Sequence, residues 1–193
     1  MSELELLTWN LNGLDEAALG PRVEAAVQDV LLGGRLEALL AAGAAPRPPP
    51  QVVVFQEVTR AMFHALLRPH LEKAGFTLHP GAPPDRTYFE LGAVRAPARV
   101  LEHRAEPLDR SQYGRWQHAL RIEHAGATWR VLHAHLDSGP EKATSAIREA
   151  QVRALAQQLE GGGAVFAGDT NLRDAEWRRA REGLALVDAW EAA

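Results

Sequence analysis

In Gly163-Ala164-Val165-Phe166-Ala167-Gly168-Asp169-Thr170-Asn171-Leu172-Arg173-Asp174, an apolar run is followed directly by polar side chains. The run predicts a buried strand that carries a carboxylate, Asp169, and a carboxamide, Asn171, at its carboxyl end. Side chains two residues apart in extended chain point to the same side, and Gly168 permits a tight turn or a close approach to a ligand. α/β folds bind ligands at such strand ends. The alternative is an Asx-turn that only closes the strand.

Three further predicted strands also end in polar residues. They end at Trp9-Asn10, at Gln56-Glu57, and at His133-Ala134-His135-Leu136-Asp137-Ser138. A single Asn or Glu at a strand end is commonly a turn former, but four such ends in one chain indicate a shared polar site. Oxygen ligands with few histidines suit Mg²⁺ or Mn²⁺, which otherwise bind waters and phosphate oxygens. The sequence therefore favours a phosphate ester as the substrate.

Hydrophobic periodicity predicts strands and helices in mixed order along the chain. Residues 51–55 form an apolar run typical of a strand buried on both faces, and Pro69 is expected to interrupt a helix over 61–75. The other predicted strands are 4–10, 76–79, 87–95, 99–104, 116–124, 128–135 and 163–168, and the other helices are 22–31, 35–42, 141–160 and 175–181, before a short strand or turn at 184–190. This order predicts a layered α/β architecture with much antiparallel sheet.

The composition is that of an ordinary globular domain of 193 residues, with 46% hydrophobic and 24% charged residues. The absence of cysteine excludes a disulfide framework and a thiolate metal site. The acidic start is unlike a signal peptide, and no apolar run approaches the roughly 20 residues of a membrane span, so we expect a cytoplasmic protein without membrane contact. The formal net charge of −4 means that any nucleic-acid contact needs a local basic face.

Four motifs together carry a family resemblance. They are Thr8-Trp9-Asn10, Gln56-Glu57-Val58, His135-Leu136-Asp137-Ser138 and Gly168-Asp169-Thr170-Asn171-Leu172-Arg173-Asp174. In this order they resemble the motifs of the endonuclease/exonuclease/phosphatase superfamily, and within it most resemble those of the 5′-tyrosyl-DNA phosphodiesterases. The resemblance implies a two-layered β-sandwich flanked by helices, as in deoxyribonuclease I. It also implies a Mg²⁺- or Mn²⁺-dependent phosphodiesterase that acts on a DNA end with a 5′ adduct, single-stranded ends included.

The resemblance implies a role for each matching residue. Glu57 would be the main metal ligand, with Asn12 beside it, and Asp169 would orient or deprotonate the attacking water. The other implied catalytic residues are Asn10 by the metal and phosphate, Asn171 beside the water, and His135 and Arg115 on the phosphate. The implied substrate contacts are Tyr88, Trp190, Arg173 and Ser138.

Two departures from the family pattern affect what we expect of activity. Many members have Trp-Asn-x-Asp at the first motif, whereas this chain has Asn12 in place of the second carboxylate. The superfamily also ends in a Ser-Asp-His motif on a last strand, and no such motif follows Asn171. We therefore expect one domain over 1–193 that is incomplete at its C-terminus, lacks the final strands and hydrolyses slowly in this form.

Three other functions stay open from the sequence. A zinc hydrolase could use His133, His135 and Asp137, which share one face of a strand, although no later histidine completes the site. A chain without the Ser-Asp-His motif could bind DNA ends or a partner through arginines of residues 99–130 without cleaving them, although acidic residues are interleaved there. A phosphatase of inositol or sugar phosphates would use the same superfamily site.

Overall fold

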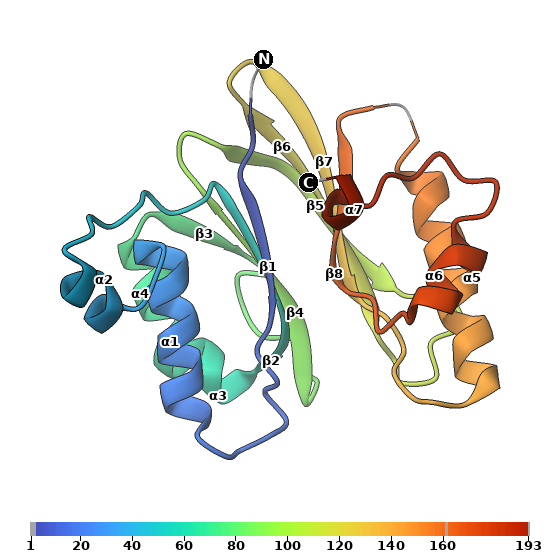
Figure 1. Cartoon of the computed structure of the whole chain (residues 1–193), viewed down its shortest axis with the longest axis horizontal. Coiled ribbons are helices and arrows are strands. Elements are labelled where there is room, and N and C mark those ends of the chain that lie inside the picture. The colour runs from blue at the N-terminus through green and yellow to red at the C-terminus, as the bar shows by residue number, and fades with distance from the viewer. Residues whose placement is uncertain (1–2, 161, 193) are drawn as a thin grey trace.

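Two four-stranded sheets stack face to face in the computed structural model, which describes residues 3–160 and 162–192, without the Trp190 side chain. The first sheet has the order β1-β2-β4-β3 and the second β5-β6-β7-β8 (Figure 1). The β1–β2 and β7–β8 pairs are parallel and the other pairs antiparallel. The strands are β1 (Leu6–Asn10), β2 (Val52–Thr59), β3 (Phe76–His79), β4 (Tyr88–Arg95), β5 (Arg99–Pro107), β6 (Trp116–His124), β7 (Ala127–His135) and β8 (Ala164–Asp169).

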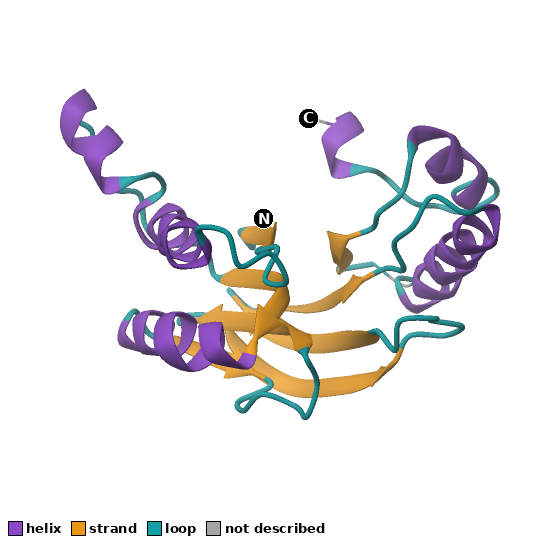
Figure 2. Cartoon of the chain, turned by 90° about the horizontal axis from the view of Figure 1, so that it is seen from below, coloured by secondary structure: helices purple, strands orange, loops and turns teal. Residues whose placement is uncertain are grey.

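Helices flank the sandwich on both sides, and Figure 2 shows the strands between the two helical groups. Beside the first sheet lie α1 (Leu19–Leu32), α2 (Leu36–Ala42), α3 (Arg60–Met62), the π-helical turn η1 (Phe63–Leu67) and α4 (Arg68–Lys73). Beside the second sheet lie α5 (Lys142–Gln158) and α6 (Asp174–Ala180), and α7 (Ala189–Ala192) follows. In the described part of the chain, no helix combines the length and the apolar character that a membrane span needs.

Alternation along each strand divides the apolar side chains into three layers. Phe55 and Phe89 face outward from the first sheet and pack with Phe63 of η1 and Val27 of α1. A second layer fills the space between the sheets, from Val52, Val54, Leu120, Ile122 and Val131. The third joins the second sheet to α5, through Leu132, Leu136, Val152 and Leu155. The predicted helix-flanked two-layered sandwich is confirmed.

Three predicted elements differ in detail from the structure. β2 does not end at Phe55 but continues through Gln56 and Glu57 to Thr59. The chain stays helical through Pro69, because the proline lies in the first turn of α4, two residues after the π-helical turn η1, where its ring and missing N–H are tolerated. The chain near 184–190 forms no strand among the described residues and instead starts the short helix α7 at Ala189.

The layer between the sheets changes from apolar to polar toward one end. On the strands that supply the apolar layer, the next inward-facing positions hold the buried polar side chains Gln56, Glu90, His118, His133 and His135. Their strands end, or bulge, at this same end of the sandwich. The fold therefore gathers the polar strand ends that the sequence indicated into one region.

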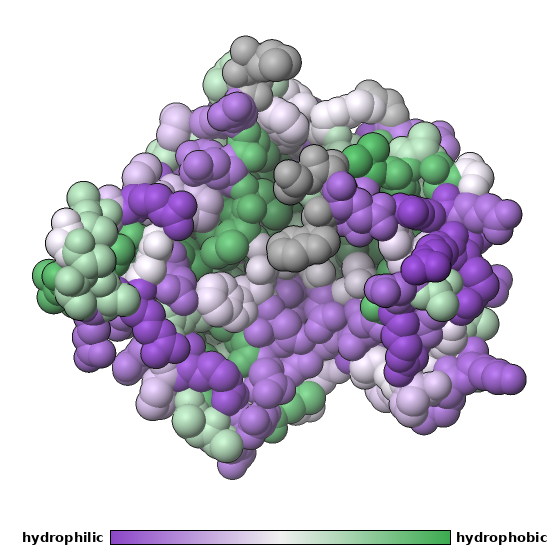
Figure 3. Space-filling model, in the orientation of Figure 1, coloured by the Kyte–Doolittle hydropathy of each residue, from purple (hydrophilic) through white to green (hydrophobic). Residues whose placement is uncertain are grey.

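Both β1 and β8 are edge strands, and each has one hydrogen-bonded neighbour among the described strands. The two edges lie in contact with each other, across from one another in the sandwich. Partly buried apolar side chains, including Leu4, Leu6 and Val165, pack there against the layer between the sheets. Figure 3 shows apolar side chains gathered in a hollow over this region.

A buried ion pair joins α5 to α6. The Arg148 side chain has no exposed surface, and its Nε and Nη2 donate to the two Glu176 carboxylate oxygens at 3.1 and 2.6 Å. Arg148 Nη1 also donates to the carbonyls of Asp137 and Gly139 at 3.1 and 3.0 Å. One guanidinium thus holds together two helices and the loop that follows β7.

We predict that Arg148→Met destabilises the protein by about 3–5 kcal/mol, because it leaves the Glu176 carboxylate buried without its partner. The double variant Arg148→Met/Glu176→Leu should regain most of the loss, since no buried charge is then unpaired. Urea unfolding measures both. Arg179→Met is the matched control, because Arg179 pairs with Glu149 at the surface and its loss should change little. Equal effects for Arg148→Met and Arg179→Met would contradict the prediction.

Candidate active site

A β-bulge sets the position of Glu57. The pairing of β2 with β4 shifts register between Phe55 and Val58, and Glu57 has a left-handed backbone with φ of 57°. Bulges re-aim side chains and are common beside active sites. Gly13 packs directly against this bulge, since a Cβ on Gly13 would lie 2.0 Å from the Glu57 carbonyl oxygen. The turn after β1 therefore requires glycine so that Glu57 can take its place.

Asn10 connects the acids of the two sheets. Its Nδ2 donates to Asp169 Oδ2 at 2.8 Å and lies 3.3 Å from Glu57 Oε1. His135 at the end of β7 lies between the same acids, with Nδ1 3.7 Å from Glu57 Oε1 and Nε2 3.5 Å from Asp169 Oδ2. Three strand ends and one bulge, far apart in sequence, thus form a single polar cluster.

Burial holds His135 neutral. The ring is 2% exposed, and desolvation, aided by Arg115, lowers its pKa to about 4. The contacts with Glu57 and Asp169 are therefore not ion pairs at neutral pH. A neutral imidazole has one N–H donor, and His135 Nδ1 has no hydrogen-bond partner. This nitrogen is available to a ligand in the cluster.

Asp169 both closes a turn and faces the cluster. Its Oδ1 accepts from the backbone N–H of Asn171 at 2.9 Å, which is an Asx-turn, while Oδ2 accepts from Asn10. Asn171 is in a left-handed conformation beyond β8, so it does not share an extended face with Asp169, and its Nδ2 donates to the Leu136 carbonyl at 3.1 Å. Gly168 permits the close approach of β8 to β7, because a Cβ there would lie 2.0 Å from the Ala134 carbonyl oxygen.

Asp137 anchors the loop that presents Arg115. Its carboxylate is fully buried and accepts from Ser111 Oγ at 2.6 Å and from the backbone N–H of Gln112 at 2.7 Å. Ser111 Oγ in turn accepts from the backbone N–H of Arg115 at 3.0 Å. The Asp137 carboxylate is thus occupied by the donors of this loop, and among the described residues His133, His135 and Asp137 do not form the metal site that a zinc hydrolase would need.

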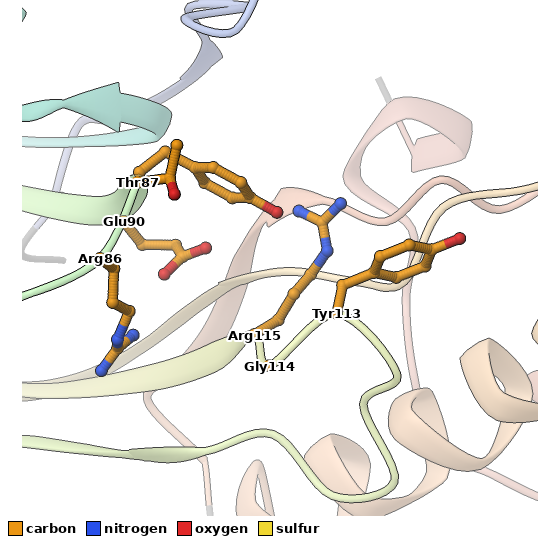
Figure 4. Close-up of a pocket in the computed structure, with 7 residues that line it drawn as sticks. Arg86, Thr87, Glu90, Tyr113, Gly114 and Arg115 are labelled. Atoms are coloured by element: carbon orange, nitrogen blue, oxygen red, sulfur yellow. The ribbon is translucent and has the colours of Figure 1, made fainter.

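Arg115 is a buried cation with unsatisfied donors. Its side chain lies 5.6 Å from the Tyr88 ring centroid and 5.7 Å from that of Tyr113, and Nη2 donates to Ser138 Oγ at 3.3 Å. Its Nε and Nη1 are buried without a hydrogen-bond partner. Tyr88, Tyr113 and Arg115 line a cavity of about 280 Å³, shown in Figure 4, together with Arg86, Thr87, Glu90 and Gly114. A buried guanidinium with two unpaired donor nitrogens calls for an anionic ligand.

The structure brings most of the predicted site residues together. Asn10, Glu57, His135, Asp169 and Asn171 surround the cluster, and Tyr88, Arg115 and Ser138 lie beside it. Asn12 is not brought in, because it is exposed and its Nδ2 points to Asp15 at 3.4 Å. Arg173 instead lies at the start of α6, 3.3 Å from Glu176. The Trp190 side chain lies outside the described part of the chain.

The arginines of residues 99–130 do not form a free basic face. Arg99 pairs with Glu123 at 2.6 Å, Arg104 with Glu102 at 2.6 Å, and Arg110 with Asp109 at 3.4 Å. Acidic neighbours therefore neutralise this surface, as their interleaving in the sequence suggested.

Four residues at the site were missed in the sequence analysis, namely Arg86, Glu90, Tyr113 and His118. Glu90 could have been identified from the sequence, because it interrupts an otherwise apolar strand at an inward-facing position. No sequence pattern marks Arg86 and Tyr113, since their positions depend on how two loops meet. Arg86 stacks on Trp116 with 3.8 Å between the guanidinium carbon and the ring centroid.

The oxygen-rich cluster fits Mg²⁺ or Mn²⁺ in its chemistry. Within the described residues, no group of three or more His, Asp or Glu side chains is arranged to enclose a metal. Glu57 with the Asn10 amide beside it would supply few protein ligands, which suits an ion that keeps several waters and binds phosphate oxygens.

The family of the chain follows from comparison with known proteins. A model described as Endonuclease/Exonuclease/phosphatase family matches residues 7–187. The chain belongs to this family. Its members are phosphoesterase hydrolases, and the family typically binds a divalent metal.

Individual relatives agree with the family match. Tyrosyl-DNA phosphodiesterase 2 of Gallus gallus is 25% identical over 195 residues, covering 98% of this chain and 47% of the relative. The chain thus spans about half the length of this curated relative. The D. rerio TDP2 structure, solved with a single-strand DNA product, is 26% identical with a TM-score of 0.74, covering 97% of this chain and 69% of that one. The human Nocturnin catalytic domain shares the fold, with a TM-score of 0.69 at 16% identity over 98% of this chain and 73% of that one.

We predict that Gly13→Ala displaces the Glu57 bulge and destabilises the protein by about 1–3 kcal/mol, because the added methyl overlaps a backbone carbonyl. Gly81→Ala is the control, since a Cβ at Gly81 would lie 3.7 Å from the Leu78 carbonyl oxygen, an ordinary contact, and alanine there should change the unfolding free energy by less than about 1 kcal/mol. Urea unfolding gives both values, and calorimetry with Mn²⁺ should show weaker binding for Gly13→Ala alone. A Gly13→Ala variant with the unfolding free energy and the Mn²⁺ affinity of the wild type would refute this prediction.

Stability should fall in acid because buried histidines resist protonation. Burial lowers the pKa of His118 to about 3 and that of His133 well below its usual value. An unfolded histidine titrates near 6.5, so below that pH the unfolded chain takes up protons that the folded chain does not. The unfolding free energy should decline as pH drops from about 6.5, at up to about 1.4 kcal/mol per pH unit for each such histidine.

The comparison that isolates this effect is His118→Gln against the wild type, measured by urea unfolding from pH 8 to pH 5 with a metal chelator. Burial raises the pKa of Glu90 to about 7, which makes the folded state more stable as the pH falls. The effect of His118 is therefore the difference between the curves of the variant and the wild type. The acid slope should be shallower in His118→Gln and unchanged in His64→Gln, whose ring is exposed. Parallel curves for all three proteins would contradict the prediction.

Proposed function

We propose that the protein is a Mg²⁺- or Mn²⁺-dependent phosphodiesterase that hydrolyses the phosphate ester at a DNA end carrying a 5′ aryl adduct. The observation that carries the proposal is Arg115, a buried guanidinium with two unpaired donor nitrogens beside the acidic cluster. Such a group is costly to bury unless an anion completes its hydrogen bonds. A phosphodiester supplies that anion.

The cluster supports in-line attack by water on a bound phosphate. Arg115 and the neutral His135 would donate to the non-bridging phosphoryl oxygens. The Asp169 carboxylate has lone pairs beyond those used by Asn10 and Asn171, so it can hold the attacking water and take its proton. A bound Mg²⁺ or Mn²⁺ would supply charge neutralisation at the phosphoryl oxygens. Asn10 contacts both Glu57 and Asp169 and fixes their relative positions, so these side chains need little rearrangement when substrate binds.

The cavity beside Arg115 favours an aromatic leaving group. The guanidinium lies near the rings of both Tyr88 and Tyr113. It can stack on the ring of an aromatic leaving group and donate a hydrogen bond to the phenolate oxygen of that group. Burial raises the pKa of Tyr88, so its phenol keeps the proton at neutral pH. The chicken relative is named a tyrosyl-DNA phosphodiesterase, and the zebrafish relative was solved with a single-strand DNA product, which supports a DNA end as the other half of the substrate.

We predict that Asp169→Asn removes nearly all hydrolysis of a 5′-phosphotyrosyl oligonucleotide in Mg²⁺ and leaves folding intact, since the amide keeps the shape but cannot take a proton. Arg115→Met should lower the rate by about 10²–10³, the usual effect of losing one transition-state donor. The rates of both variants are measured by chromatography of the two products, tyrosine and the oligonucleotide 5′-phosphate. Arg99→Met is the control, because Arg99 pairs with Glu123 away from the cluster.

The same assay separates the neighbouring functions. An abasic-site duplex tests a repair endonuclease and inositol hexakisphosphate tests a phosphatase. If only the abasic duplex is cleaved, the proposed aryl leaving group is wrong. If phosphate is released only from inositol hexakisphosphate, DNA is not the substrate. A wild type with no activity on any of the three would refute the proposal.

A further inference from the structure

One buried acid at the cavity has no part in the chemistry described so far. Glu90 lies on β4 at an inward-facing position, is 2% exposed and lines the same cavity as Arg115. Figure 4 shows the Glu90 and Arg115 side chains approaching this cavity from β4 and from the start of β6. Among the described residues, no arginine or lysine forms an ion pair with Glu90. A lone carboxyl so placed is costly to ionise.

Burial therefore keeps this acid protonated. Desolvation raises the pKa of Glu90 to about 7, against a smaller opposing effect of its own backbone N–H, Arg115 and Arg86. His118 lies beside this carboxyl, with Nε2 3.9 Å from Glu90 Oε2. Since burial also keeps His118 neutral, the two form a neutral acid beside a neutral base and not an ion pair.

A line of histidines leads from Glu90 toward the surface. His118 Nδ1 and His103 Nε2 share a hydrogen bond at 3.0 Å, and the rings stack at 5.3 Å. The His103 ring contacts that of His79 at 5.4 Å, and both of these are only partly buried. His118 Nε2 has no hydrogen-bond partner, and its distance to Glu90 is one that a single water can bridge. An imidazole can accept a proton at one nitrogen and release one from the other.

We propose that Glu90 donates a proton to the leaving-group oxygen of the bound phosphodiester, and that His103 and His118 return a proton to it from solvent. The inference rests on the proposed function, because it needs a phosphate held by Arg115 with its leaving group in the cavity. If Asp169 holds the attacking water on one side of the phosphorus, the leaving group points to the other side, toward the cavity that Glu90 lines.

The step balances without a further reactant. Water oxygen bonds to phosphorus, and one water proton goes to Asp169. The bond from phosphorus to the leaving-group oxygen breaks, and that oxygen takes the Glu90 proton. Glu90 is left as a carboxylate, which takes a proton that enters at His103 and passes through His118, while Asp169 releases its proton to solvent. The net reaction is hydrolysis of a diester to a monoester and an alcohol or phenol.

The test uses leaving groups of different basicity. Thymidine 5′-phosphate esters of 4-nitrophenol, phenol and methanol are assayed in Mg²⁺ with wild type, Glu90→Gln and Glu123→Gln. A proton donor matters little for 4-nitrophenolate and greatly for methoxide, so Glu90→Gln should hydrolyse the nitrophenyl ester within a few fold of wild type and the methyl ester about 10²–10⁴ times more slowly. Glu123→Gln should match the wild type throughout, because Glu123 pairs with Arg99 at the surface.

Two further readouts distinguish donation from a structural role. With the phenyl ester, the wild-type rate should fall toward alkaline pH as Glu90 loses its proton, and this limb should be missing in Glu90→Gln. The groups that face Glu90 are Arg86, Tyr88, Arg115, Glu57 and His118, and all are retained in this variant. His118→Gln should lower kcat and KM for the phenyl ester together and leave kcat/KM unchanged, since it slows proton return after hydrolysis and not binding or bond breaking.

Infrared difference spectra of wild type against Glu90→Gln provide a measurement independent of activity. A protonated carboxyl band should be present at pH 6 and absent at pH 9. A band absent at pH 6, or a Glu90→Gln variant that slows all three esters equally or none, would overturn the inference while leaving the proposed function intact. A wild type that hydrolyses no ester and no tyrosyl oligonucleotide would refute the proposed function, and the role of Glu90 with it.

Discussion

The layer of side chains between the two sheets is the constraint on which the rest of the structure depends. Strand alternation sends every second residue of the strands in both sheets into this layer, where it must pack against the opposite sheet. At one end Val52, Val54 and Ile122 fill it with apolar volume. At the other end the same strands supply acids, amides and imidazoles that hydrogen-bond across the gap. The apolar end stabilises the sandwich. The packed strands of the sandwich then fix the positions of the side chains at the polar end.

The polar end is held in place by groups that are themselves buried. Asp137 accepts three side-chain or backbone donors of one loop and α5, and Arg148 holds the carbonyls on either side of Ser138. These contacts fix Arg115 and Ser138 with few alternative conformations. A guanidinium positioned in this way meets an anion without paying for rearrangement, which is why transition-state donors are effective when their surroundings are rigid.

Buried titratable groups in this layer keep their neutral forms. His118, His133 and His135 have lowered pKa values and Glu90 a raised one, in each case chiefly through desolvation. A cluster that would be highly charged in water is thus largely uncharged inside, except at Arg115 and the acids near solvent. This arrangement concentrates the electrostatic attraction for phosphate on a few groups.

The residue patterns by themselves determined a layered α/β architecture and the strand ends that form the site, and the family resemblance of the motifs indicated the sandwich. Periodicity located β3 and β6 to the residue, because alternating runs bounded by turns depend on local chemistry alone. Asn10, Glu57, His135 and Asp169 could be found because polar residues directly follow apolar runs. Only the tertiary structure decided the directions of the side chains. The bulge that turns Glu57, the Asx-turn of Asp169, the anchoring of Asp137 to the loop before β6, and the approach of Glu90 and Arg86 to Arg115 all depend on how one strand or loop meets another. Such long-range contacts have no local pattern in the chain, so no spacing or propensity could have specified them.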